Sequence, residues 1–211
     1  MKILGITGGV GAGKSTILSY LRERYGASVI LADEVGHMVQ EPGQECYEKI
    51  VEQFGTEILC EPEQGTASQE QVRRIDRQKL GALVYTDRNA LERLNALVHP
   101  AVKTYIIAEI ERARCDAQVP FVVVEAALLL EDHYDQICDE IWYIYTDPDV
   151  RVQRLIQSRG YSMEKIRNIM QNQMQDAEFR RRCDYVIDNS SDFIENTYEQ
   201  IDEGLVGHGF L

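Results

Sequence analysis

The stretch Gly8-Gly9-Val10-Gly11-Ala12-Gly13-Lys14-Ser15 has the pattern G-x-x-x-x-G-K-S and decides the fold of this chain. In this pattern, the P-loop, glycines let backbone N–H groups approach a polyphosphate, because a Cβ would block that approach. The lysine supplies a positive charge near the β- and γ-phosphates, and the serine hydroxyl can bind Mg²⁺. The residues expected to bind a nucleotide here are Gly9, Val10, Gly11, Ala12, Gly13, Lys14, Ser15 and Thr16.

The sequence on either side of the P-loop fits the strand–loop–helix setting that the motif needs. Residues 2–7 form a short apolar run, which is typical of a buried strand. From Ser15 to Tyr25, apolar residues recur at helical spacing, and Gly26 stands where a helix C-cap is expected. The rival dinucleotide fingerprint G-x-G-x-x-G fails, because the position of its last glycine is taken by Lys14.

Composition narrows the class of protein. The chain has 211 residues and a formal net charge of −13, so we expect no nucleic-acid partner, since duplex-binding proteins are normally basic. No apolar run is long enough to span a bilayer, and we expect neither a leader peptide nor a membrane partner. Five scattered cysteines without a C-x-x-C pair indicate reduced thiols, no zinc site and a cytoplasmic location.

Continuous apolar runs predict a parallel sheet that is buried on both faces, in an α/β fold of the P-loop type. Helical stretches separate the runs. One helix has Asp147 as its N-cap and Pro148 as its first residue, and the next begins near Ser162 and keeps its apolar face as far as Ala177. The expected strands cover residues 2–7, 28–32, 121–125, 140–146 and 184–188, and a last helix covers about 193–205.

The segment 34–118 has no convincing strand and is too long for a single crossover helix, so it predicts a mostly helical insertion. Its main loop is expected around 60–68, where Pro62 and Gly65 occur. His99-Pro100 interrupts one long periodic pattern, which predicts one helix before the proline and another after it.

Asp33 follows the apolar run 29–32, so it is expected at the carboxyl end of the second strand. That end lies next to the P-loop if the β-α-β unit is right-handed, and ligands of open α/β sheets bind at such strand ends. A carboxylate there can accept a proton from an attacking hydroxyl, which makes Asp33 the candidate general base. The alternative is an N-cap for a helix that starts at Glu34.

Three further residues have a functional and a plain structural interpretation. Glu125 ends the third expected strand, where an acid can hold Mg²⁺ through water or simply terminate the strand. Arg154 and Arg159 flank a helix end before Gly160 and can close over a nucleotide to stabilise charge on the transferring phosphoryl group. Their alternative is a solvated helix face.

With these residues placed, the chain closely resembles the dephospho-coenzyme A kinase family almost from end to end. Its P-loop segment resembles the family's opening, and residues 29–33 resemble the family's I-D-A-D segment. Further matches are Glu41-Pro42-Gly43, Ile75-Asp76-Arg77, Leu80-Gly81, Leu97-Val98-His99-Pro100-Ala101-Val102, Leu128-Leu129-Leu130-Glu131, Arg154, Arg159, Gln173 and residues 183–189.

The chain departs from the family pattern at a few positions. Leu31 replaces the first aspartate of I-D-A-D, which leaves Asp33 as the candidate base there. Ala127 replaces the proline before Leu128 and loosens the loop expected to position Glu131. Glu125 stands where an aspartate is usual, and Cys183 replaces an alanine.

The resemblance implies transfer of the γ-phosphoryl group of ATP, with Mg²⁺, to the ribose 3′-hydroxyl of dephospho-coenzyme A. It implies a P-loop core (1–33 and 119–211) with a small lid (about 151–178), and a helical acceptor-binding subdomain (34–118). Lys14, Asp33, Arg154 and Arg159 are the implied catalytic residues, and Ser15 and Glu125 are the metal ligands. Asp33, Arg77, His99 and Glu131 are acceptor-side candidates, and Asn189 approaches the adenine.

Some alternatives stay open at this point. His99 can be a buried N-cap beside Pro100, and Asn189 can be a turn residue. The fold also suits another small P-loop kinase that acts on a nucleoside monophosphate or a sugar acid, although the His99-Pro100 and Leu128–Glu131 signatures argue against it. A non-catalytic nucleotide-binding protein is disfavoured by Asp33, and a purely structural domain would need an accidental P-loop. We expect a monomer or a weak homo-oligomer.

Overall fold

The computed structural model describes residues 1–61, 73–126 and 128–211. The described residues form two compact units, one made of Met1–Leu31 and Glu109–Leu211 and the other of Ala32–Ala108. Most of the loop expected at 60–68 lies outside the described residues, and so does Ala127.

The first unit is built on a parallel five-stranded sheet, so the predicted α/β fold is confirmed. The strand order is β2-β3-β1-β4-β5. Strand β3 therefore lies between β1 and β2, so the strand before Asp33 is not the neighbour of the P-loop strand. The strands are β1 (Lys2–Thr7), β2 (Ser28–Leu31), β3 (Phe121–Glu125), β4 (Glu140–Tyr145) and β5 (Tyr185–Asp188).

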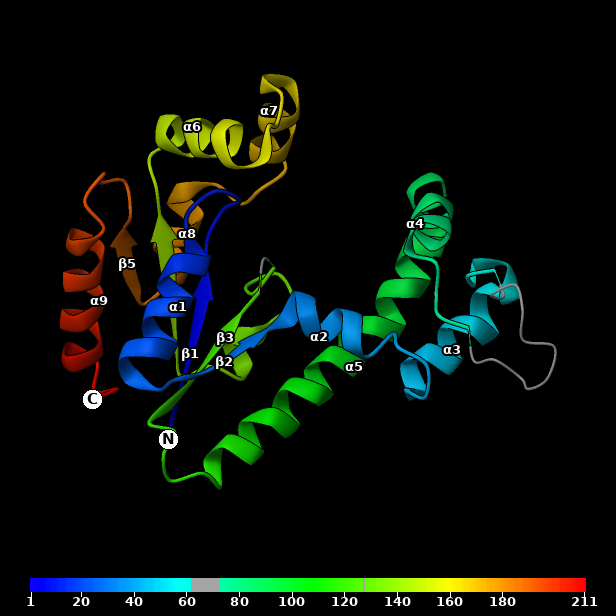
Figure 1. Cartoon of the computed structure of the whole chain (residues 1–211), viewed down its shortest axis with the longest axis horizontal. Coiled ribbons are helices and arrows are strands. Elements are labelled where there is room, and N and C mark those ends of the chain that lie inside the picture. The colour runs from blue at the N-terminus through cyan, green and yellow to red at the C-terminus, as the bar shows by residue number, and fades with distance from the viewer. Residues whose placement is uncertain (62–72, 127) are drawn as a thin grey trace. The chain divides into compact units, whose positions relative to one another are not determined.

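Helices α1 (Lys14–Tyr25) and α9 (Glu195–Gly207) pack on the same face of this sheet (Figure 1). Leu21 of α1 and Leu205 of α9 join one buried cluster with Trp142 of β4. Burial of such side chains contributes about 1.5–3 kcal/mol each. The predicted C-cap is confirmed, because Gly26 is left-handed with φ 70° and donates to the last carbonyls of α1.

The other face of the sheet carries α8 (Asp176–Arg182), whose Phe179 stacks on Tyr143 with ring centroids 4.5 Å apart. Helix α6 (Pro148–Arg159) begins as predicted, with the Asp147 side chain capping it through the Asp149 amide. The prediction of a single helix from Ser162 to Ala177 was wrong. This part of the chain contains two helices, α7 (Met163–Gln171) and the start of α8.

The break between α7 and α8 has a visible cause. Helix α7 ends at Gln171 with Asn172 as its C-cap, and Gln175 is extended with ψ 152°. Between them, the Gln173 side chain accepts a hydrogen bond of 2.6 Å from Arg151. A tertiary contact of this kind overrides a local periodic pattern, whose free-energy preference for helix is weak.

The second unit is helical in its described part, apart from an isolated antiparallel bridge between Leu59 and Ile75. The Asp76 side chain caps α4 by accepting from the amides of Gln78 and Lys79. The helices are α2 (Ala32–Met38), α3 (Glu45–Phe54), a 3₁₀ turn at Thr56–Ile58, α4 (Arg77–Thr86) and α5 (Arg88–Arg114), the last of which continues into the first unit.

Pro100 does not divide the long periodic pattern into two helices as expected, because α5 runs through it. A proline inside a helix removes one hydrogen bond and costs about 3 kcal/mol. Its ring is exposed, while Ala90, Val102 and Ile106 are buried on either side of it. Their burial offsets the lost bond. Of the helices described, none is both long and apolar enough to cross a lipid bilayer.

Candidate active site

The P-loop connects β1 to α1 and presents the N-terminus of that helix. The Ala12 amide donates to the Gly9 carbonyl at 3.1 Å, and Gly13 has a left-handed conformation with φ 86° and ψ 18°. A side chain at Gly13 would strain this backbone and would overlap the amide nitrogen of Asn189. No acidic residue occupies the first turn of α1. The loop therefore ends at a helix N-terminus whose dipole favours an anion.

Lys14, the first residue of α1, lies beside Glu125, the last residue of β3. The Lys14 ammonium donates to the Gly8 carbonyl at 2.7 Å and lies 3.5 Å from a carboxylate oxygen of Glu125. Both side chains are largely buried, with exposed fractions of 15% and 13%. Strand β3 pairs with β1 with Glu125 opposite Ile6, which puts this carboxylate beside the start of the loop.

The residue that binds the outer side of the loop is Arg151, a residue not predicted for the site. Its Nε donates to the Val10 carbonyl at 3.1 Å, and a second nitrogen donates to Gln173. A Cβ on Gly9 would overlap the guanidinium, so glycine is needed there for the close approach. Burial lowers the pKa of Arg151 below its ordinary value, and Tyr143 opposes that shift. The feature of the sequence that could have identified Arg151 is its place in the first turn of the helix predicted after Asp147.

The two predicted lid arginines differ in their surroundings. One guanidinium nitrogen of Arg154 lies 3.5 Å from the point where a side chain on Gly13 would begin, so Arg154 reaches the loop. Arg159 is exposed and lies 5.9 Å from the ring of Tyr161. No described contact joins Arg159 to the P-loop.

Asn189 lies under the loop and is 3% exposed. Its amide nitrogen donates to the Ala12 carbonyl at 2.8 Å, and its side-chain oxygen accepts from Thr197 at 2.9 Å. Asn189 is therefore more than a turn residue. An approach to adenine stays a prediction.

The acceptor-side candidates lie mainly in the second unit. Asp33 is exposed in the first turn of α2, which begins at Ala32 rather than after Asp33. His99 is half-buried inside α5, so the alternative of an N-cap beside Pro100 was wrong. Arg77 begins α4 and lies 3.8 Å from Glu41, which also pairs with Arg74.

Arg74 and Arg77 line a cavity of about 530 Å³ in the second unit. Its lining includes Gln40, Glu41, Cys60, Arg74, Arg77 and Gln78. Glu131 lies in the first unit, where it is exposed in the turn after Leu130.

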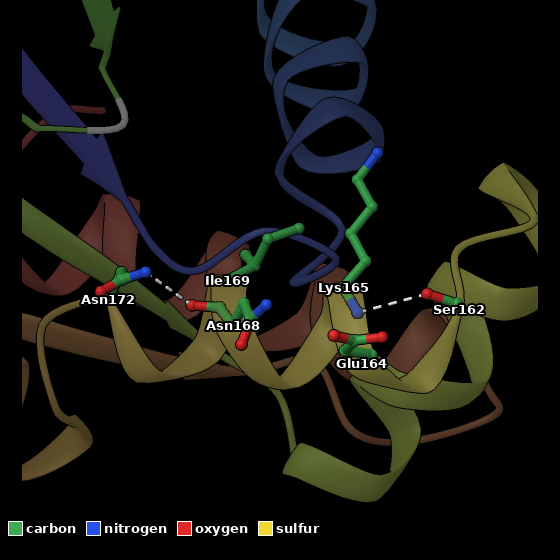
Figure 2. A pocket seen from close by; sticks show the side chains of 6 residues that line it. All are labelled: Ser162, Glu164, Lys165, Asn168, Ile169 and Asn172. Atoms are coloured by element: carbon green, nitrogen blue, oxygen red, sulfur yellow. Dashed lines mark hydrogen bonds between the residues drawn. The ribbon is translucent and has the colours of Figure 1, made fainter. Parts of the chain in front are cut away.

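A second open cavity of about 530 Å³ lies along α7 (Figure 2). The two hydrogen bonds drawn there link the Ser162 hydroxyl to the Lys165 amide and the Asn172 amide group to the Asn168 carbonyl. The first caps this helix at Ser162, near which it was predicted to begin, and the second is made by its C-cap residue. None of the lining residues was predicted for the site.

The oxygen donors near the loop suit Mg²⁺. Ser15 in the first turn of α1 offers a hydroxyl, and Glu125 offers a carboxylate next to Lys14. Mg²⁺ prefers oxygen and is usually held by one or two protein ligands, with water and phosphates completing its shell. Within the described ranges, no three His, Cys, Asp or Glu residues gather to form a metal site by themselves. A magnesium ion shared with a nucleotide needs no such group.

Comparison with known proteins agrees with this geometry. The family model for dephospho-CoA kinase matches residues 2–195. A dephospho-CoA kinase from Symbiobacterium thermophilum is 36% identical over 202 residues, covering 96% of this chain and 79% of that protein. The one from Oceanobacillus iheyensis is 34% identical and covers 96% of both chains.

Solved structures give the same result at the level of the fold. TT1252 from Thermus thermophilus superimposes with a TM-score of 0.78 at 26% identity, covering 98% of this chain and 97% of that one. Dephospho-CoA kinase from Campylobacter jejuni superimposes with a TM-score of 0.70 at 22% identity over the full length of both chains. With a matching family model over nearly the whole chain and relatives above 30% identity, this protein belongs to the dephospho-CoA kinase family.

Proposed function

We propose that this protein transfers the γ-phosphoryl group of ATP to the ribose 3′-hydroxyl of dephospho-CoA, giving CoA and ADP in CoA biosynthesis. Membership of the family supports the reaction. The observation that carries the proposal is the P-loop, with Lys14 at the N-terminus of α1 between the Gly8 carbonyl and the Glu125 carboxylate. Such a loop binds phosphate through backbone amides and one positive charge.

The protein acts mainly by positioning and by stabilising charge. Phosphoryl transfer passes through a loose transition state with little covalent chemistry for the protein to do. Amides of the loop from Gly9 to Thr16 hold the β- and γ-phosphates, and Lys14 neutralises charge between them. Arg154 and Arg159 cover the transferring group, and Arg151 supports the loop from outside. Preorganised donors of this type contribute about 10²–10³ in turnover each.

Asp33 is the proposed general base. It accepts the proton of the ribose hydroxyl as that oxygen attacks the γ-phosphorus, and ADP leaves on the opposite side. A general base contributes about 10²–10⁴ in rate. Its exposure on α2 leaves it accessible to an acceptor.

Mg²⁺ would be held by Ser15 and, directly or through water, by Glu125, and it would supply positive charge at the β- and γ-phosphate oxygens.

For the acceptor we propose the helical segment 34–118, with Arg77, His99 and Glu131 as contacts. The segment about 151–178 is the proposed lid. Asn189 was predicted to approach the adenine, and its hydrogen bonds to Ala12 and Thr197 also allow it to support the loop. We further infer a cytoplasmic enzyme that is a monomer or a weak homo-oligomer.

The test is coupled ADP detection with Mg-ATP, with and without dephospho-CoA. Acceptor-dependent ADP release, with a product whose new phosphate is on the 3′-oxygen by phosphorus NMR, is expected. Nucleoside monophosphates, shikimate and gluconate serve as the comparison acceptors. A higher turnover with one of these, or no acceptor-dependent release from folded protein that binds ATP, contradicts the proposal.

A further inference from the structure

A buried polar cluster lies directly beneath the phosphate loop. Its members Thr146, Asn189 and Thr197 have exposed fractions of 3%, 3% and 0%. They come from the ends of β4 and β5 and from α9, so three separate elements converge on this point. Buried polar groups are costly unless they are hydrogen-bonded, so the bonds they make indicate what the cluster is for.

The bonds of the cluster converge on the carbonyl of Ala12. The Asn189 amide nitrogen lies 2.8 Å from this oxygen, and the Thr146 hydroxyl lies 3.0 Å from it. A carbonyl can only accept, so the nitrogen end of the Asn189 side chain must face it. The Thr197 hydroxyl then donates to the other end of the amide at 2.9 Å and holds that orientation.

The position of this carbonyl determines where the next amide points. The Ala12–Gly13 peptide bond is trans, since the described chain has no cis peptide, so its C=O and N–H point in opposite directions. A carbonyl held inward by Asn189 turns the Gly13 N–H outward, away from the buried cluster. Gly13 belongs to the phosphate-binding segment of the motif, where backbone N–H groups are the ligands.

Asn189 also lies too close to Gly13 for any side chain to fit there. The amide group therefore packs against the loop at the residue where the helix begins. Its own polar atoms are engaged with Ala12 and Thr197, which are parts of the protein.

We propose that Asn189, oriented by Thr197, is a positioning residue that sets the Ala12–Gly13 peptide and thereby the affinity of the loop for the phosphates. It acts on the nucleotide through the loop rather than by touching the adenine. This inference rests on the proposed nucleotide site and extends it by a support that the motif itself does not contain.

The test separates phosphate binding from base recognition. The affinities of the full-length enzyme for Mg-ATP and for inorganic tripolyphosphate are measured by calorimetry. Asn189→Leu keeps the shape of the side chain and adds no charge, but it removes the hydrogen bonds. Thr197→Val removes only the group that orients Asn189. Asn196→Leu is the matched control, because Asn196 lies one residue before Thr197 but is exposed and bonds to Ser191.

Asn189→Leu is expected to weaken the binding of ATP and of tripolyphosphate by a similar factor, about tenfold or more, since the buried Ala12 carbonyl loses one of its two donors. Thr197→Val should weaken both ligands in the same ratio by a smaller factor, and Asn196→Leu should change neither. Loss of ATP affinity with unchanged tripolyphosphate affinity would show an adenine contact and overturn the proposal. Unchanged binding of both ligands would overturn it too.

The test does not depend on the folding of one variant or on the identity of the acceptor. If Asn189→Leu does not fold, as judged by circular dichroism and thermal melting, Thr197→Val is judged by the same criterion. The binding assay needs no acceptor. A wild-type protein that binds ATP but does not phosphorylate dephospho-CoA would therefore contradict the proposed reaction and leave this inference to be decided by the binding data.

Discussion

Lys14 and Glu125 form a largely buried ion pair at the start of the P-loop, with 3.5 Å between the ammonium nitrogen and a carboxylate oxygen. The Lys14 ammonium also donates to the Gly8 carbonyl. The carboxylate thus holds the lysine at the loop, and it also places a negative charge where a triphosphate is expected. A Mg²⁺ ion held by Glu125, as proposed above, would offset that repulsion, so the two functions proposed for Glu125 can be separated by experiment.

Glu125→Gln is expected to lower turnover with saturating Mg-ATP by about tenfold or more, because the proposed magnesium ligand is lost. The same change should strengthen the binding of ATP in the presence of a chelator, since a negative charge is removed. Calorimetry with and without Mg²⁺ measures both effects. Glu140→Gln is the control, because Glu140 has a similar exposure of 17% but begins its strand and pairs with Lys2. Equal effects of the two substitutions would exclude a specific role for Glu125.

Asp33→Asn should lower kcat by about a hundredfold or more, because the proposed base for the ribose hydroxyl is lost. The KM for ATP should stay near its wild-type value, since the P-loop is unchanged. Glu34→Gln removes the neighbouring exposed acid in the same turn of α2 and should have little effect on kcat. If Asp33→Asn keeps wild-type turnover, Asp33 is not the base.

Arg151→Ala is expected to lower kcat/KM for ATP by about tenfold or more, because the phosphate loop loses the donor that holds its Val10 carbonyl. It removes the bonds to the Val10 carbonyl and to Gln173. Arg151→Lys keeps the charge but not the planar fork, so its activity should be intermediate. The control is Arg181→Ala, which removes an exposed arginine paired with Glu178. Steady-state kinetics with varied ATP decide, and a loss shared with Arg181→Ala would contradict the prediction.

Thr7→Val should raise the free energy of unfolding by about 1 kcal/mol. The Thr7 side chain is fully buried, and its hydroxyl has no hydrogen-bond partner among the described residues. Valine keeps the shape and removes the unsatisfied polar group. Thr146→Val is the comparison, because that buried hydroxyl is bonded and its loss should cost about 1 kcal/mol. Urea unfolding measures the free energy of unfolding of both variants. Equal destabilisation by the two substitutions would contradict the prediction.

Cys138 should resist thiol reagents in the folded protein at pH 8. Burial raises its pKa to about 12, and Asp139 and Asp135 add to the shift, so the reactive thiolate is scarce. Cys60 and Cys115 are exposed and should be labelled first. Mass spectrometry after timed labelling identifies the modified residues. Early labelling of Cys138 would show that its burial is not maintained in solution.

The same shift has a consequence for stability. The unfolded thiol loses its proton near pH 9 and the folded one only near pH 12, so the folded state binds more protons between these values. The contribution of Cys138 to stability is therefore complete below about pH 9 and is lost as pH rises toward 12. Cys138→Ala should flatten the fall in stability between pH 9 and 11, measured by urea unfolding.

Much of the core could be predicted from sequence, because its determinants are local. Continuous apolar runs predicted all five strands of the sheet to within a residue at each end. The caps at Gly26, Asp147 and Ser162 follow from side chains and glycine conformations that act within a few residues.

The errors all involve forces between distant segments. Pro100 was expected to end a helix, but packing on both sides of it carries α5 through. The helix after Ser162 was expected to continue, but Gln173 turns out of it to meet Arg151. A periodic pattern contains no information on either contact, nor on the strand order that inserts β3 between β1 and β2.

In the candidate site, too, the local residues could be predicted from the sequence and the distant partners could not. The P-loop motif specifies its own residues because its backbone chemistry is local. Arg151 and the cluster beneath Ala12 come from residues more than a hundred positions away, joined to the loop by single hydrogen bonds. No spacing rule identifies such partners. The roles proposed for Asp33, Arg77, His99 and Glu131 depend on the acceptor and remain predictions.

The pairing of β1 has a consequence for how the protein is made. Lys2 pairs with Phe121 and Leu4 with Glu140, so when β1 leaves the ribosome both of its neighbours are still to be synthesised. Closing so long a loop carries an entropic cost, and non-local pairings form slowly. The unit Ala32–Ala108 is translated in full before either partner strand. During translation the phosphate loop thus follows an apolar strand without its partners, and such an exposed strand edge is prone to aggregate until β3 and β4 have been made.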